Sequence, residues 1–155
     1  MSWAVDTNVL LRTTDVGDPV QSLAEGAIEN LRLSGESLSI FPQNLIEFWA
    51  VATRRRANNG LGLSPSQAES QLGALKAMFV VLEDKPEIFS RWERIVGLYQ
   101  VTGKQAHDAR IVVAMSVHGL THLLTFNDRD FKRFTEITVV NPQDIISPSG
   151  SEHSD

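Results

Sequence analysis

Ser2-Trp3-Ala4-Val5-Asp6 is a short run of small and apolar residues that ends at a carboxylate. A short, nearly continuous apolar run is typical of a strand that is buried on both faces of a parallel sheet. Four similar runs, rich in Val, Ile, Leu and Phe, follow later in the chain and predict four further strands. They are residues 38–41, 79–82, 122–126 and 137–140.

Segments of helical length separate these five strands. Strands that alternate with helices favour a parallel sheet with helices on both faces. We therefore predict an α/β protein, a three-layer α/β/α sandwich around a central, mostly parallel, five-stranded sheet in residues 1–146. The expected helices span about residues 19–33, 43–58, 66–77, 86–101 and 105–118.

The composition limits where the protein works and what it can bind. We find no run of the roughly 18–20 apolar residues that a membrane span needs, and no signal segment near residue 1, so we expect a cytoplasmic protein without a membrane partner. The chain contains no cysteine, which leaves His, Asp and Glu as metal ligands. The tail 147–155 is small and polar, and we expect it to be disordered.

The net charge of −5 counts against a broadly basic surface that grips nucleic acid. The objection weakens if several acids surround divalent cations in one site, because the cations offset their charge. The placement of the acids is therefore decisive.

Several acids are expected at one edge of the sheet. Ligands of open α/β sheets bind at the carboxyl ends of the strands, and Asp6 follows the first strand there. Asp128 and Asp130 leave a second parallel strand at the same edge. Asp108 opens the apolar helix 109–117, whose N-terminus lies near that edge if it leads into the strand at 122–126.

Glu47 interrupts an otherwise apolar helical stretch, residues 45–51. Its helical neighbours, among them Asn44, Val51 and Arg54, leave it little room. An enclosed carboxylate needs a cation or strong hydrogen-bond donors, and a divalent metal would serve several neighbouring acids at once.

Each acid also has a simpler interpretation. Asp6 is a common strand-ending residue, Asp108 suits the first turn of a helix, and Glu47 is within reach of an ion pair with Arg54. The acids of the loop 125–131 have basic neighbours to pair with. Their joint position at one edge favours a shared site over four separate explanations.

Four segments in this order are similar to the PIN domain, and within it to the VapC-type toxins of bacterial toxin–antitoxin pairs. They are Val5-Asp6-Thr7-Asn8-Val9-Leu10-Leu11-Arg12, Asn44-Leu45-Ile46-Glu47-Phe48-Trp49, His107-Asp108-Ala109-Arg110-Ile111 and Leu124-Thr125-Phe126-Asn127-Asp128-Arg129-Asp130-Phe131.

The resemblance implies a Mg²⁺ or Mn²⁺ site with Asp6 and Asp108 as principal ligands. Glu47 would be a ligand directly or through water, and the loop 127–130 would supply a fourth member. Asn127, Asp128 and Asp130 are alternatives for that position, and we choose Asp130. The resemblance further implies that Thr7, Asn8, Thr125, Asn127 and Arg129 hydrogen-bond the acids or the substrate.

The implied activity is a metal-dependent endoribonuclease that hydrolyses RNA phosphodiester bonds as the toxin of a toxin–antitoxin pair. Such toxins dimerise and are inhibited by a small antitoxin, for which Phe48-Trp49 and the helix at 66–78 offer candidate contacts. Arg54-Arg55-Arg56, expected on the helix of Glu47, would bind the RNA backbone or serve solubility, as would Arg110, Arg129, Lys132 and Arg133 near the other acids.

Two alternatives come from other functional classes. An α/β phosphatase could use Asp6 as its nucleophile, although the second acid expected two residues later is Asn8. A non-catalytic PIN-like module could bind RNA or protein only, although all four acids are retained.

Overall fold

The computed structural model describes residues 1–146, so the expectation for the tail 147–155 lies outside the described residues. All five strands pair in parallel, in the order β3-β2-β1-β4-β5. The predicted three-layer α/β/α class is confirmed, and the sheet is wholly parallel. The strands are β1 (Ser2–Val5), β2 (Ser37–Ile40), β3 (Val80–Val81), β4 (His122–Leu124) and β5 (Thr138–Val140).

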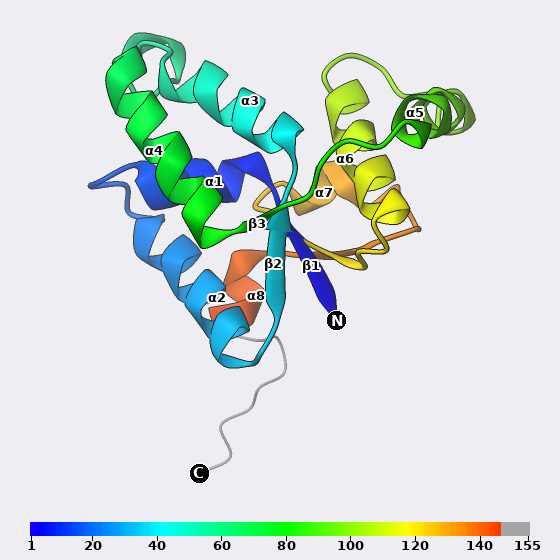
Figure 1. Cartoon of the computed structure of the whole chain (residues 1–155), viewed down its shortest axis with the longest axis horizontal. Helices are drawn as coiled ribbons and strands as arrows, with labels where there is room; N and C mark the ends of the chain where they lie inside the picture. The colour runs from blue at the N-terminus through cyan, green and yellow to red at the C-terminus, as the bar shows by residue number, and fades with distance from the viewer. Residues whose placement is uncertain (147–155) are drawn as a thin grey trace.

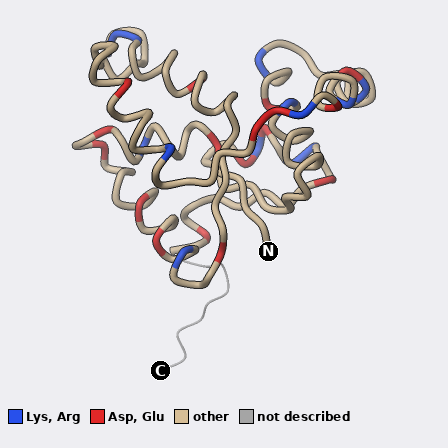
Figure 2. The backbone as a smooth tube through the Cα atoms, viewed as in Figure 1, with Lys and Arg blue, Asp and Glu red and all other residues tan. Residues whose placement is uncertain are grey.

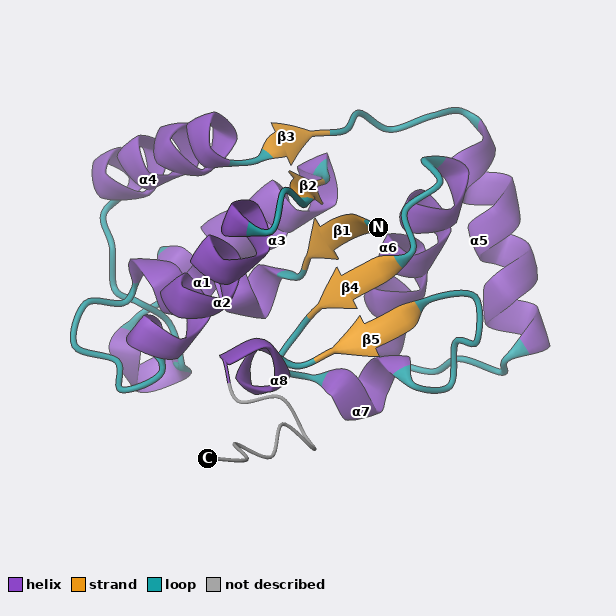
Figure 3. Ribbon diagram, turned by 90° about the horizontal axis from the view of Figure 1, so that it is seen from below, coloured by secondary structure: helices purple, strands orange, loops and turns teal. Residues whose placement is uncertain are grey.

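Helices cover both faces of this sheet (Figures 1 and 3). α1 (Thr7–Thr14), α2 (Gln21–Leu33), α3 (Pro42–Ala52) and α4 (Pro65–Met78) lie on one side. α5 (Glu87–Leu98) and α6 (Gln105–Val117) lie on the other. Three short elements complete the described chain: a 3-10 turn at Arg56–Asn58, α7 (Asp128–Phe131) and α8 (Pro142–Ile146).

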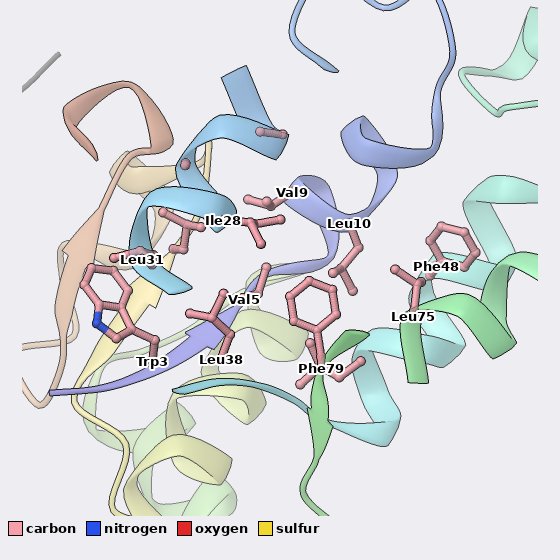
Figure 4. Close-up of a cluster of buried hydrophobic side chains, with 14 of the residues drawn as sticks. Trp3, Val5, Val9, Leu10, Ile28, Leu31, Leu38, Phe48, Leu75 and Phe79 are labelled. Carbon is pink, nitrogen blue, oxygen red and sulfur yellow. The ribbon is translucent and has the colours of Figure 1, made fainter. Parts of the chain in front are cut away.

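Alternate side chains of each strand enter different cores. Trp3 and Val5 of β1 point into a cluster with Leu10, Ile28 and Phe48, which Figure 4 shows in close-up. The residue between them, Ala4, packs in a second cluster with the apolar face of α6. Both faces of the sheet are therefore buried, which explains why its strands read as continuous apolar runs.

The strand order places a crevice next to β1. The chain moves from β1 through β2 to β3 on one side and then returns to form β4 and β5 on the other. The carboxyl ends of β1 and β4 are thus a topological switch point, where open α/β sheets bind their ligands. Val5 pairs with Leu124 there, so the residues that follow both strands start side by side.

The helix predicted at 43–58 is shorter than expected. It ends at Ala52, and the N–H groups of Gly60 and Gly62 donate to the carbonyls of Arg55 and Arg54, at 3.0 and 2.8 Å. The prediction that Arg54-Arg55-Arg56 share a helix with Glu47 is therefore wrong, because the chain folds back on itself directly after α3. Among the helices of residues 1–146, none is long and apolar enough to cross a membrane.

Candidate active site

Asp6 stands where β1 passes into α1. Its N–H donates to the Leu124 carbonyl at 2.9 Å, which continues the ladder with β4, and its side chain caps α1. Oδ1 accepts from the Thr7 N–H at 2.8 Å. Oδ2 accepts from the Thr125 hydroxyl at 2.8 Å and from the Asn8 amide at 3.3 Å. Three donors thus hold this carboxylate, and Asp6 as a whole residue is only 7% exposed.

Burial raises the pKa of Asp6 from 3.8 to about 7. The hydrogen bonds from Thr125 and Thr7 oppose this shift, while the negative charges of Asp108 and Glu47 add to it. Near neutral pH this carboxyl is poised between its two protonation states, and a nearby cation would favour the charged one.

Asp108 lies in the first turn of α6 and lines the same hollow as Glu47 of α3. Partial burial raises its pKa to about 6, and the charges of Asp130 and Glu47 contribute, while Lys104 acts in the opposite direction. Two acids from distant parts of the sequence are therefore shifted in the same direction by one shared environment.

Glu47 is half-buried on α3, and its hydrogen-bond partners are not Arg54, the partner that the simpler interpretation offered. Its Oε1 accepts from the Thr7 hydroxyl at 2.7 Å, and its Oε2 accepts from the Gln43 amide at 3.0 Å. Within residues 1–146 it forms no ion pair with Arg54, because that residue lies beyond the end of α3. Neutral donors, not a cation of the chain, therefore satisfy this carboxylate.

The loop after β4 separates its three candidate residues. Asp128 pairs with Lys132 at 3.7 Å and accepts from the Asn141 amide at 3.4 Å, on the side of the helical turn away from the hollow. Asp130 and Asn127 both line the hollow. Asp130 is also close enough to Asp108 to shift the pKa of that residue.

All four predicted acids face one hollow of about 280 Å³. Thr7, Asn8 and Asn127 also line it, whereas Thr125 is fully buried and Arg129 is not part of its wall. Its walls consist of Asp6, Thr7, Asn8, Leu11, Glu47, Val51, Lys104, His107, Asp108, Asn127 and Asp130.

The hollow suits a hard cation that needs few protein ligands. In the described part of the chain, no three His, Asp or Glu side chains are arranged to hold one ion together. Mg²⁺ is commonly bound through one or two carboxylates and completes its shell with water and phosphate oxygens. Asp6 and Asp108 fit that requirement, since both offer oxygen atoms to the same hollow and both are destabilised in their charged form.

The basic residues near the acids differ in how strongly they are engaged. Arg56 pairs with Asp15 at 3.0 Å, and Arg110 binds Gln43 and Asp84. For residues 1–146, neither an ion pair nor a side-chain hydrogen bond involves Arg54 or Arg55, and both are exposed. Figure 2 shows basic and acidic positions interspersed along the chain.

Sequence reasoning missed Gln43, Asn44, Lys104 and His107 as parts of the site. Asn44 is fully buried and donates to the Thr7 hydroxyl at 3.1 Å. Gln43 precedes Glu47 by four residues, so helical spacing alone places the two side chains on one face. For Lys104 and His107 the signal was their position around Asp108 at the start of a predicted helix.

Comparison with family models confirms the predicted resemblance. The model of the PIN domain matches residues 4–137, and the chain belongs to the PIN-domain family. Nuclease activity follows from this family, whose members generally use divalent metal ions. No curated protein sequence matches the chain.

Solved structures of toxin–antitoxin proteins share this fold. The structure of VapBC2 from Rickettsia felis, bound to a DNA fragment from its promoter, has a TM-score of 0.70 at 14% identity, covering 91% of this chain and 98% of that one. VapBC-1 from nontypeable Haemophilus influenzae has a TM-score of 0.68 at 17% identity, covering 92% and 99%. VapC20 from Mycobacterium tuberculosis, a toxin that cleaves the sarcin–ricin loop, has a TM-score of 0.58 at 18% identity, covering 79% and 87%.

Proposed function

We propose that this PIN domain is a Mg²⁺-dependent endoribonuclease that hydrolyses RNA phosphodiester bonds. The observation that carries the proposal is the single hollow shared by Asp6, Glu47, Asp108 and Asp130, in which burial and mutual repulsion raise two pKa values. A protein that only needed a stable fold would not gather these charges, because burying each of them costs free energy.

Asp6 and Asp108 would hold the cation directly, and Glu47 and Asp130 would reach it through water. When bound, such a cation activates water, neutralises phosphoryl oxygens and stabilises the departing oxygen. Mn²⁺ suits the same oxygen ligands.

The chain's own residues divide the remaining tasks. Glu47, held at both oxygens by Thr7 and Gln43, is fixed well enough to orient the attacking water. Asp130 has no hydrogen bond from another described side chain, and in our proposal it accepts the proton of that water. Thr125 acts through Asp6 as a positioning residue, because its buried hydroxyl does not reach the hollow.

Exposed polar and basic residues would bind RNA on either side of the scissile phosphate. Asn8 and Asn127 line the hollow as candidate donors, and Lys104 contributes a positive charge to its wall. Arg54, Arg55 and Arg129 lie outside it and would contact phosphates further along the strand.

We further propose that the protein is a cytoplasmic toxin that dimerises and is inhibited by a small cognate antitoxin. The shared fold with chains from VapBC complexes supports this. Phe48 is fully buried in the first core, so it is not accessible to an antitoxin. Trp49 is partly exposed and Met78, at the end of α4, is exposed, so these two residues remain candidate contacts. Co-expression with the small protein encoded beside it tests the partner: capture and loss of nuclease activity are expected, and an active monomer that captures nothing contradicts the toxin assignment.

The variant Asp6→Asn tests the nuclease. The wild type is expected to cleave RNA in Mg²⁺ and to stop when a chelator is added. Loss of outer-shell partners of metal sites already costs about 10- to 100-fold, so replacing a direct ligand should lower the cleavage rate by more than about 100-fold. Asp144→Asn, at an exposed position of α8, is the matched control and should cleave normally.

Two outcomes contradict the assignment. A variant Asp6→Asn that cleaves at the wild-type rate removes Asp6 from the metal site. A folded wild type that binds RNA but cuts none in Mg²⁺ or Mn²⁺ is a non-catalytic module. The phosphatase alternative predicts hydrolysis of p-nitrophenyl phosphate, but both oxygens of Asp6 are already held by donors, which disfavours it as a nucleophile.

A further inference from the structure

We propose that Gln43 is a positioning residue that fixes the carboxylate of Glu47 against α6 and thereby sets the geometry between the acids of α3 and α6. This inference rests on the proposed nuclease function. Gln43 lies in the first turn of α3 and is only 8% exposed. It lines a second hollow of about 380 Å³, which adjoins the acid hollow through Glu47 and His107.

Three hydrogen bonds use the side-chain amide of Gln43 at both ends. Its Nε2 donates to Glu47 Oε2 at 3.0 Å and to the backbone carbonyl of His107 at 2.8 Å. Its Oε1 accepts from Arg110 Nη1 at 3.0 Å. A flipped amide would turn its oxygen toward two acceptors and its hydrogens toward a guanidinium, so the observed orientation alone satisfies all three neighbours.

The position of these partners explains why the bridge matters. α3 packs in the first core through Phe48 and Ala52, whereas α6 packs in the second, on the other face of the sheet. Gln43 joins the two helices at the mouth of the site. The carbonyl that it binds belongs to His107, the residue directly before Asp108, so one amide links Glu47 to the backbone that carries Asp108.

Arg110 links the side chain of Gln43 to Asp84. Its Nη1 binds Gln43, and its Nη2 lies 3.3 Å from Asp84 Oδ1 in the segment between β3 and α5. Asp84, Arg110, Gln43, Glu47 and Thr7 thus form a continuous chain of polar contacts. Loss of Gln43 would leave Glu47 with the Thr7 bond alone and allow its carboxylate plane to turn.

The first experiment replaces Gln43 by methionine, which is similar in length and makes none of these hydrogen bonds. We expect kcat on an RNA oligonucleotide in saturating Mg²⁺ to fall about 10- to 100-fold, as for other outer-shell partners, with KM changed less than about threefold. Binding of Mn²⁺ alone, followed by electron paramagnetic resonance, should weaken about tenfold. Gln71→Met, at an exposed position of α4, is the control and should match the wild type.

A double-mutant cycle separates positioning from a general structural role. If Gln43 acts through Glu47, Gln43→Met should lower kcat less than about twofold in a Glu47→Gln background. If it only supports the fold, the fold-change is the same in both backgrounds, which overturns the proposal. The proposal is also overturned if the single variant Gln43→Met has the same kcat as the wild type.

Arg110→Met provides a second variant if Gln43→Met does not fold. It keeps the amide but removes its outer support, and we expect a smaller loss of kcat, about three- to tenfold; no loss contradicts the proposed chain of contacts. A wild type that fails to cleave RNA refutes the proposed function instead. In that case the Mn²⁺-binding measurement still tests the role of Gln43. If Gln43→Met binds Mn²⁺ with the same affinity as the wild type, Gln43 does not position the metal site.

Discussion

Two aspartates in the segment after β4, Asp128 and Asp130, are only two residues apart and have different surroundings. Asp128 is engaged by Lys132 and Asn141. Asp130 faces the hollow and shifts the pKa of Asp108. A sequence offers no means to choose between them, because the choice depends on how a one-turn helix is set against β5.

Paired substitutions in this loop test our choice. Asp130→Asn should lower kcat by about 100-fold or more, since it removes the proposed proton acceptor. Asp128→Asn should change kcat less than about threefold, because it breaks only an exposed ion pair. Steady-state cleavage of one RNA oligonucleotide by both variants is the measurement, and the reverse order of effects would assign the fourth position to Asp128.

The sequence was sufficient to place Asp6, Glu47 and Asp108 together but not to identify their partners. Strand order and helix direction bring these three acids to one edge. The alternative interpretation, an ion pair of Glu47 with Arg54, does not occur, because it required the helix to continue past residue 52. The actual donors, Thr7 and Gln43, come from a helix that was not predicted and from the same face of α3.

At the level of elements, the five strands and the long helices were predicted, and the short helices were not. α1, α7 and α8 are absent from the prediction, since helices this short have little stability of their own and depend on packing. The early end of α3 has a different cause. A Cβ on Gly60 would lie 2.0 Å from the Arg54 carbonyl oxygen, so the absence of a side chain permits the close turn that stops the helix.

Arg54 and Arg55 are exposed at this turn, and their proposed contribution to RNA binding can be measured. In the double variant Arg54→Gln, Arg55→Gln, the slope of log affinity against log salt should decrease in magnitude by about 1.4, the value for two phosphate contacts to a single strand. Arg91→Gln with Arg94→Gln on α5, which lines a hollow separate from the acids, is the matched control. An unchanged slope in the first pair would assign these arginines to solubility.

At the level of the whole molecule, the site makes the metal-free protein sensitive to pH. Asp6 has a folded-state pKa of about 7, raised from 3.8. Because the folded state holds this proton more tightly than the unfolded state, the stability from Asp6 is full below pH 3.8 and is lost as the pH rises through about 7. Asp108 acts in the same direction up to about pH 6, weakened by its partial exposure.

The pH dependence that comes from Asp6 can be measured as the free energy of unfolding by denaturant, for the wild type and Asp6→Asn with a chelator present. The variant should gain stability relative to the wild type as the pH rises from 4 to 8, by on the order of 3 kcal/mol. Mg²⁺ at 100 times its dissociation constant should stabilise the wild type at pH 8 by about 2.7 kcal/mol, much less at pH 5, and leave the variant unchanged. If the difference in unfolding free energy between the wild type and Asp6→Asn does not depend on pH, burial does not destabilise the charged Asp6 carboxylate.

The strand order also determines when the site can exist. Its four acids are Asp6, Glu47, Asp108 and Asp130, and β1, which directly precedes Asp6, has β4 as one of its two neighbours. During synthesis, a chain that ends before β4 has no Thr125 to hold Asp6 and no Asp130 to complete the hollow. The proposed ribonuclease would therefore emerge from the ribosome inactive, and would acquire its activity only when β4 and the segment after it have joined the fold.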